Sequence, residues 1–259
     1  MTNAQCVVLA IAMVPESRVL LQPCFVLHQR PYRDTSVLLD LFSRDHGRLS
    51  AVARGARAER SRLRGVLQAF TPLLVSWFGR TELMTLVHAE IASPPLVFSG
   101  ARIFSGLYLN ELLLRLAPQA DALPDLFDAY KLVLAELSVA GISEADALRR
   151  FELCLIRQLG YDVALTHDVH GDAIDPARQY GFVLERGLIP AGSARQEGVS
   201  VSGRALAVFG SGDCEDPAVL NEIRIITRAA LGALLGSQPL RSRELLVAFH
   251  ATKKPTESG

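Results

Sequence analysis

The first third of the chain alternates apolar and polar positions with a period of two, which is typical of β-strands. Strands are expected at 25–30, 36–43, 48–54, 70–78 and 81–91. In the second of these, Val37 and Leu39 lie on one side and Asp40 on the other. Pro72 cannot donate to a ladder, so the fourth strand should begin at a sheet edge or a bulge. Turn residues separate the five segments.

After Pro94 and Pro95 the spacing of apolar residues changes to that of helices. Helices are expected at 103–116, 124–137, 144–159, 217–235 and 242–249. Gly160 follows the third of them, as a stop signal. The stretch 161–200 is richer in Gly, Asp and Pro and includes short β-like pieces, so it is interpreted as an inserted hairpin or loop region.

These patterns predict an α+β protein whose amino-terminal part is a five-stranded barrel. Five strands in about 70 residues, with a long connection after the third, favour the oligonucleotide-binding (OB) fold. The expected organisation is an extension at 1–24, the OB barrel at 25–95, a helical domain at 96–250 with an insertion at about 161–200, and a disordered tail at 251–259. The apolar segment 6–14 is not preceded by Lys or Arg, which argues against a secretory signal.

Composition narrows the class of protein. The chain has 259 residues, of which 49% are hydrophobic and 21% charged, as in proteins that bury a core. Its 27 Lys+Arg balance 27 Asp+Glu, which excludes a uniformly basic coat protein for nucleic acid. No apolar run approaches the roughly 20 residues that cross a bilayer, so we expect a protein without a membrane segment. The four cysteines form no CxxC pair, which favours a reducing cytoplasm.

The neutral total hides one basic segment. Residues 44–64 carry seven arginines against Asp45 and Glu59, a net of +5, so the remainder totals −5. Five of these arginines lie between Arg54 and Gly65, in the connection after the third strand. Guanidinium groups bind phosphates through paired donors, and each neutralised phosphate releases counterions. The segment therefore predicts a nucleic-acid site, although a solvated loop in an arginine-rich chain is the alternative.

Single-stranded nucleic acid also stacks on aromatic side chains. Tyr32 is the best exposed aromatic candidate, because it lies in the turn between Arg30 and Arg33. A tyrosine that packs on the rim of the barrel is an equally good interpretation. Other aromatic residues on the strands are expected in the core, namely Phe42, Phe70, Trp77 and Phe78.

Signatures of enzymes are missing from the sequence. It has no P-loop, no HExxH, no GxSxG and no complete dinucleotide fingerprint. His167 and His170 form an HxxH pair near Asp168 and Asp172, but a second pair of ligands is lacking, so ordinary loop histidines are favoured over a metal site.

Polar residues interrupt two of the expected helices. Asn110 and Glu111 lie in an otherwise apolar helix and are expected to tie neighbouring elements together. Arg149 and Arg150 stand beside Phe151 and Leu153 near the start of another helix. Cations next to apolar groups suit an acidic, aromatic peptide tail, although an ordinary surface helix is the simpler interpretation.

Five stretches, together with the order in which they occur, resemble the RecO family of bacterial recombination mediators. They are FVLHQRPYRDTSVLLDLFSRDHGRLSAVARGAR, RGVLQAFTPLLVSWFGRTELMTLVHAE, FSGLYLNELLLRL, ALRRFELCLIRQLGY and QPLRSRELLVAF, and the likeness runs from about residue 25 to 249. The resemblance implies an OB barrel followed by a helical domain. It also implies a protein that is not an enzyme, binds single- and double-stranded DNA, anneals complementary strands, and with RecR helps to load RecA onto DNA coated by single-stranded-DNA-binding protein.

The resemblance further implies two sets of site residues. The basic barrel positions that match the family's DNA contacts are Arg30, Arg33, Arg48, Arg54, Arg57, Arg60, Arg62 and Arg64. The segment that matches the site for the tail of the single-stranded-DNA-binding protein contains Arg149, Arg150, Phe151 and Leu153. Some family members hold zinc with four cysteines in the region of 161–200. This chain has no cysteine between Cys154 and Cys214, so no metal or other cofactor is expected.

Two other classes of function stay open at this point. The barrel would bind protein, with incidental DNA contact, if the chain were an interaction scaffold. A metal-dependent nuclease is the third possibility, and strand cleavage with added magnesium or manganese would reveal it.

Overall fold

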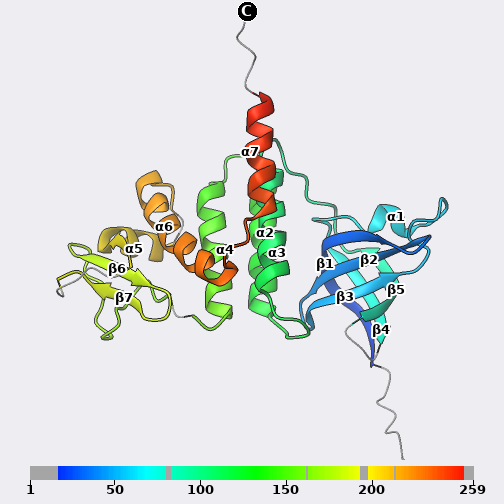
Figure 1. Cartoon of the computed structure of the whole chain (residues 1–259), viewed down its shortest axis with the longest axis horizontal. Coiled ribbons are helices and arrows are strands. Elements are labelled where there is room, and N and C mark those ends of the chain that lie inside the picture. Colours follow the sequence, from blue (N-terminus) through cyan, green and yellow to red (C-terminus); the bar gives the residue numbers. More distant parts are fainter. Residues whose placement is uncertain (1–16, 80–82, 162, 193–197, 213, 254–259) are drawn as a thin grey trace, which may run out of the picture.

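The computed structural model of the protein describes residues 17–79, 83–161, 163–192, 198–212 and 214–253. Three parts follow one another along its long axis (Figure 1). The barrel lies at one end, a layer of helices in the middle, and a small sheet with its helices at the other end. Residues 1–16 and 254–259 lie outside the described residues, and with them most of the expected extension and tail.

The amino-terminal part is a closed barrel of five strands in the order β1-β2-β3-β5-β4. β3 and β5 pair in parallel, and the other neighbours pair antiparallel. This closure confirms the expected OB-type barrel. The strands are β1 (Ser17–Tyr32), β2 (Ser36–Ser43), β3 (Gly47–Ala53), β4 (Leu73–Gly79) and β5 (Leu83–Ile91).

The first strand begins at Ser17, so the boundary expected at residue 25 is wrong. Residues 17–24 pair with β4, from Ser17 opposite Gly79 to Cys24 opposite Leu73. A shift of register between Val19 and Gln22 breaks the alternation there, and Leu21 has a φ of 47°. The pattern of period two is lost at such a bulge, which is why the sequence did not predict this half of the strand.

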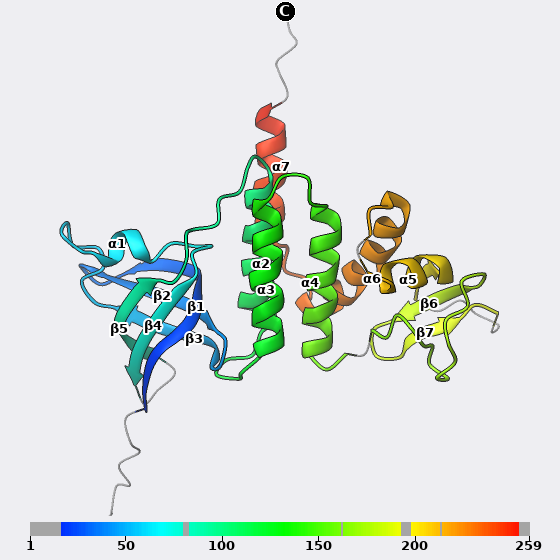
Figure 2. The same ribbon diagram turned by 180° about the vertical axis from the view of Figure 1, so that it is seen from behind.

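The helices of the middle layer begin and end within a few residues of their predicted positions. Local signals explain several boundaries: Ser143 caps the third by accepting from the Asp146 N–H, and Asp216 accepts from Ala218 N–H ahead of a proline at the first helical position. The helices are α2 (Arg102–Leu116), α3 (Pro124–Ser138), α4 (Glu144–Gln158), α6 (Pro217–Leu235) and α7 (Arg241–Lys253). In Figures 1 and 2, α7 stands beside α2 and extends past it.

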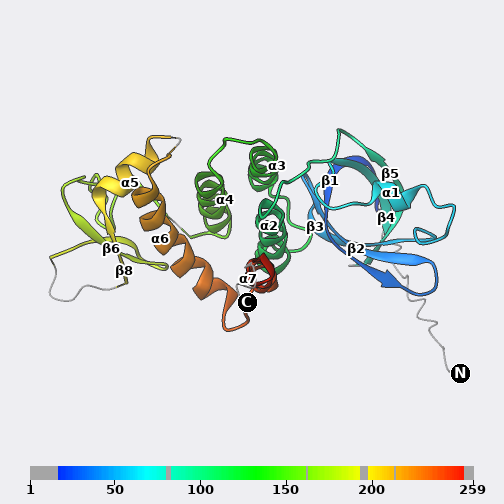
Figure 3. The ribbon, with the colours of Figure 1, turned by 90° about the horizontal axis from the view of Figure 1, so that it is seen from above.

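The expected insertion is a three-stranded sheet in the order β7-β6-β8, joined to a helix that the sequence did not predict. The strands are β6 (Gln179–Val183), β7 (Gly187–Pro190) and β8 (Val199–Ser202), and the helix is α5 (Gly203–Gly210). Viewed from above, this sheet and α5 lie at the opposite end from the barrel (Figure 3). A second unpredicted helix, α1 (Leu63–Val66), lies in the arginine-rich connection.

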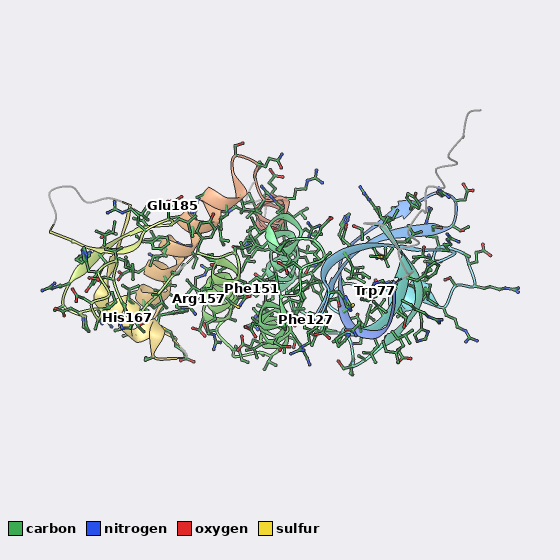
Figure 4. All side chains as sticks on the ribbon, turned by 90° about the horizontal axis from the view of Figure 1, so that it is seen from below. Trp77, Phe127, Phe151, Arg157, His167 and Glu185 are labelled. Carbon is green, nitrogen blue, oxygen red and sulfur yellow. The ribbon has the colours of Figure 1, made fainter. Side chains whose placement is uncertain are left out.

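The protein has two hydrophobic clusters, one inside the barrel and one that spans the helices and includes outward-facing residues of β1. Because successive residues of a strand point to opposite faces, Cys24 and Val26 face the barrel interior while Phe25 and Leu27 pack against the helices. Phe25 contacts Phe127 of α3, with ring centroids 5.5 Å apart. Figure 4 shows Trp77 inside the barrel and Phe127 in the helical layer. The outer face of β1 therefore packs against the helical layer.

Candidate nucleic-acid interface

A hydrogen bond brings two arginine-rich segments of the barrel together. The backbone N–H of Arg57, after β3, donates to the carbonyl of Thr35 in the β1–β2 turn at 2.8 Å. The Arg57 guanidinium also donates to the carbonyl of Arg33 at 3.4 Å. The turn and the loop after β3 therefore form one surface, the arginine face. Its arginines are all exposed: Arg30, Arg33, Arg54, Arg57, Arg60, Arg62 and Arg64.

The arginine face is strongly cationic. The acidic residues on the same two segments are Asp34 and Glu59. Within the described residues, no salt bridge is formed by its seven arginines. Arginines without an acidic partner among the described residues are available to phosphates, and paired guanidinium donors match phosphate geometry.

Tyr32 lies at one side of the arginine face and is half-buried. The Arg33 guanidinium carbon lies 5.3 Å from the centroid of its ring, a cation–π contact. Phe42, Phe70 and Trp77 are buried, as expected for core residues, whereas Phe78 is half-buried. Tyr32 is thus the aromatic side chain of the predicted set that adjoins the arginine face.

Arg48 does not belong to the arginine face, although the family pattern placed it there. Its side chain is half-buried, and its Nε donates to the carbonyl of Ala117 at 3.0 Å. Its own carbonyl accepts from the N–H of Ala120 at 2.9 Å. These bonds tie β3 to the connection between α2 and α3, because alternate residues of β3 point away from the barrel interior, toward the helices.

The two histidines of the insertion make contacts within their own loop. His167 is exposed, and its Nδ1 lies 2.9 Å from the hydroxyl oxygen of Thr166. Asp168 accepts from the N–H of His170 at 2.8 Å, so it caps a turn. Among the described residues no group of three or more His, Cys, Asp or Glu side chains is arranged to hold a metal ion. Figure 4 places His167 far from Trp77 of the barrel.

A second feature is a cavity of about 390 Å³ between α2, α4, α6 and α7. Apolar side chains such as Phe104 and Leu231 line it. Four arginines line it as well: Arg149, Arg224, Arg228 and Arg243. Sequence reasoning found the first and missed the others, because they come from helices far apart in the chain. Arg224 and Arg228 share one face of α6 through their i,i+4 spacing, which is the one signal that the sequence carried.

Arg149 is buried in this cavity wall and belongs to a small polar network. Its guanidinium pairs with Glu152, which also accepts from the Tyr108 hydroxyl at 2.7 Å. Burial, and then the nearby Glu152 charge, raise the pKa of Tyr108 well above its ordinary value. The Arg149 Nε and the Glu152 Oε2 atoms are buried without a hydrogen-bond partner in the protein. A buried donor without a partner costs free energy, which a carboxylate ligand would recover.

The other residues of the predicted tail site point elsewhere. Arg150 pairs with Glu136 at 2.9 Å and with Asp146 at 2.8 Å. Phe151 and Leu153 are buried in the core, so neither is available at the surface. Successive residues of a helix are about 100° apart, so residues at 149, 150, 151 and 153 cannot all face one site. The prediction that these four residues form one surface patch is therefore wrong, and of the four only Arg149 lines the cavity.

Both halves of the chain match models of known protein families. The family model described as "Recombination protein O N terminal" matches residues 17–95, and "Recombination protein O C terminal" matches residues 98–244. The chain is 42% identical over 237 residues to "DNA repair protein RecO" of Aromatoleum aromaticum, which covers 90% of this chain and 98% of the relative. It is 41% identical over 245 residues to the protein of the same name from Chromobacterium violaceum, 92% and 99% of the two chains.

A third relative, "DNA repair protein RecO" of Sodalis glossinidius, is 42% identical over 239 residues, 92% of this chain and 91% of its own. In the part of the chain that the structure describes, every helix is too short or too polar to cross a bilayer. Two family models in sequence order, and relatives aligned over almost their full length, agree with the OB-type barrel and helical layer. The chain therefore belongs to the RecO family and has a role in DNA repair and recombination.

Proposed function

We propose that the chain is a non-catalytic DNA-binding mediator that binds single- and double-stranded DNA, anneals complementary strands, and acts in the cytoplasm at the nucleoid. The observation that carries the proposal is the bond from the Arg57 N–H to the Thr35 carbonyl, because it merges two arginine-rich segments into one face. Helping RecR to load RecA onto strands coated by single-stranded-DNA-binding protein is part of the proposal and rests on family membership.

The mechanism is neutralisation of charge. Two complementary strands repel each other through their phosphates, and a cationic surface lowers that repulsion while it releases counterions. The arginines of the loop bind phosphates of the backbone, which leaves base edges free to pair. Tyr32 supplies one stacking surface beside them.

Replacing Arg57, Arg60, Arg62 and Arg64 by Ala tests the DNA site. The slope of log affinity against log salt for single strands should become shallower by about 3, since each phosphate contact contributes roughly 0.7. A control variant replaces Arg178 and Arg204, two exposed arginines at the far end of the molecule. An unchanged slope in the loop variant overturns the assignment. Annealing by the purified wild-type chain separates the mediator from the interaction scaffold, which would give none.

For the arginine-lined cavity we propose a peptide partner, the acidic tail of the single-stranded-DNA-binding protein that ends in phenylalanine. The cavity combines apolar walls, which suit an aromatic ring, with four arginines, which suit carboxylates. Arg228→Glu at its exposed rim should weaken binding of such a peptide at least tenfold by reversing one charge. Arg178→Glu is the control. Equal binding by Arg228→Glu and wild type in a fluorescence titration contradicts this site.

A further inference from the structure

A smaller cavity of about 380 Å³ opens beside the arginine face. It lies between the β1–β2 hairpin, the residues that follow β3, and α1. Its floor is apolar, formed by Val37, Ala56 and Leu67, which are 9%, 3% and 2% exposed. Leu63 of α1 forms a half-buried wall. In Figure 1, α1 stands at the end of the barrel next to this hairpin.

The rim of the cavity offers hydrogen bonds and positive charge. Gln29 is exposed, and its amide makes no hydrogen bond within the described residues. Gln68 uses its Nε2 to donate to the Arg64 carbonyl at 2.7 Å, which leaves its amide oxygen as an acceptor. Arg57 and Arg64 also line the cavity. The cavity is thus a slot with a small apolar floor and a mostly polar lining, to which two glutamines and two arginines contribute.

This combination fits one chemical class of ligand. A nucleobase has apolar faces that suit the floor, and an edge of donors and acceptors that suits two amides. Its phosphate suits a guanidinium at the mouth. The volume lies within the range of about 300–1,000 Å³ that is usual for small-ligand sites. In a duplex the base is stacked and paired, so only an unpaired base can enter such a slot.

We propose that this cavity binds one unstacked base of single-stranded DNA while Arg57 and Arg64 hold the neighbouring phosphates. The proposal rests on the DNA-binding function proposed above and names what one part of that surface recognises. A base inside the cavity cannot pair. The cavity therefore favours single strands over duplex, and it releases its base as annealing passes this point.

Leu63→Trp tests the cavity by filling it. Affinity for single-stranded DNA should fall about tenfold, within the range for loss of one base contact, while duplex affinity and the salt slope stay unchanged. Val97→Trp is the control, because Val97 is 75% exposed and does not line the cavity. An oligonucleotide that carries abasic sites has no base to place in the cavity, so Leu63→Trp and wild type should bind it with equal affinity.

The outcomes separate this inference from the DNA-binding proposal. If Leu63→Trp binds single strands as well as wild type while the four-arginine variant binds weakly, the cavity holds no base and the arginine face still binds DNA. If the four-arginine variant keeps its salt slope, the arginine face itself is wrong. Gln68→Ala, an exposed substitution, gives the same readout should Leu63→Trp fail to fold, and full single-strand affinity in that variant also overturns the inference.

Discussion

The hydroxyl of Tyr130 donates a hydrogen bond to the side-chain oxygen of Asn110 at the junction of barrel and helices. Asn110 in turn donates through its Nδ2 to the carbonyl of Leu27 on β1, at 2.9 Å. Both side chains are buried. The expectation that Asn110 ties neighbouring elements together is confirmed, and the element that it reaches is the barrel.

Tyr130→Phe should lower the free energy of unfolding by about 1–3 kcal/mol, because the Asn110 oxygen would be left buried without a donor. Urea unfolding measures the change. Tyr161→Phe is a suitable control, since the Tyr161 hydroxyl makes no hydrogen bond within the described residues. A loss of equal size in both variants would show that the bond to Asn110 contributes nothing.

Alkaline pH should destabilise the wild-type protein through the same tyrosine. Burial raises the pKa of Tyr130 above its ordinary value of 10.0. Its contribution is fully present below that ordinary value and is lost as the pH rises beyond it, because the phenol ionises first in the unfolded chain. Stability measured between pH 9 and 11, chosen to bracket about 10, should fall more steeply in wild type than in Tyr130→Phe. Parallel curves would contradict the assignment.

Gly47→Ala should destabilise the protein, because Gly47 lies where the barrel contacts the connection between α2 and α3. Gly47 begins β3 with a φ of 61°, and a Cβ there would overlap the backbone carbonyl of Asp121. The left-handed conformation alone costs about 1–3 kcal/mol for a residue other than glycine. Thermal unfolding checks the loss, and Gly55→Ala is the control, because Gly55 also has a positive φ but has open space at its Cβ. The first variant must be the less stable of the two.

Arg48→Ala should reduce stability and leave DNA binding almost unchanged. The substitution removes the bond from Nε to the Ala117 carbonyl and leaves that acceptor without this donor, at a cost of about 1 kcal/mol. The salt slope for single strands should change by less than the roughly 0.7 expected for one phosphate. A larger change would return Arg48 to the DNA site.

Acidic pH should loosen α7 through Glu111. Burial raises the pKa of this carboxyl, but bonds from Ser242 and from the N–H of Arg241 outweigh it and lower the pKa below 4.5. This stabilisation is present above the ordinary pKa and is lost as the pH falls through the folded value. The stability difference between wild type and Glu111→Gln should shrink from pH 6 to pH 3, a window that spans the usual range of a glutamate. A stability difference that does not change with pH would contradict this role of Glu111.

The position of α7 matters for the proposed peptide site, because Arg243 and Leu246 of that helix line the larger cavity. Residues of α2 hold both ends of the connection: Arg115 donates to the carbonyls of Leu235 and Gln238, and Glu111 accepts from residues that begin α7. The shape of the peptide cavity thus depends on contacts made outside it.

Local patterns in the sequence were sufficient where the determinants lie close along the chain. Alternation predicted the barrel strands from residue 25 onward, and helical spacing with caps predicted α2, α3, α4 and α6 to within a residue or so of each end. The shorter α5 has only eight residues and follows a strand directly, so its period is too brief to recognise. The bulge near Leu21 concealed the start of β1 for a related reason.

By itself the sequence determined an OB-type barrel, a helical layer, and a run of arginines in the connection after the third strand. The tertiary structure decided which of those arginines serve one surface: it joined Arg57 to the turn at Thr35 and directed Arg48 toward Ala117. It also buried Phe151 and assembled the arginine-lined cavity from four helices. Periodicity reports on neighbours a few residues apart, whereas contacts between distant residues follow from how the barrel and helices pack to bury their apolar faces.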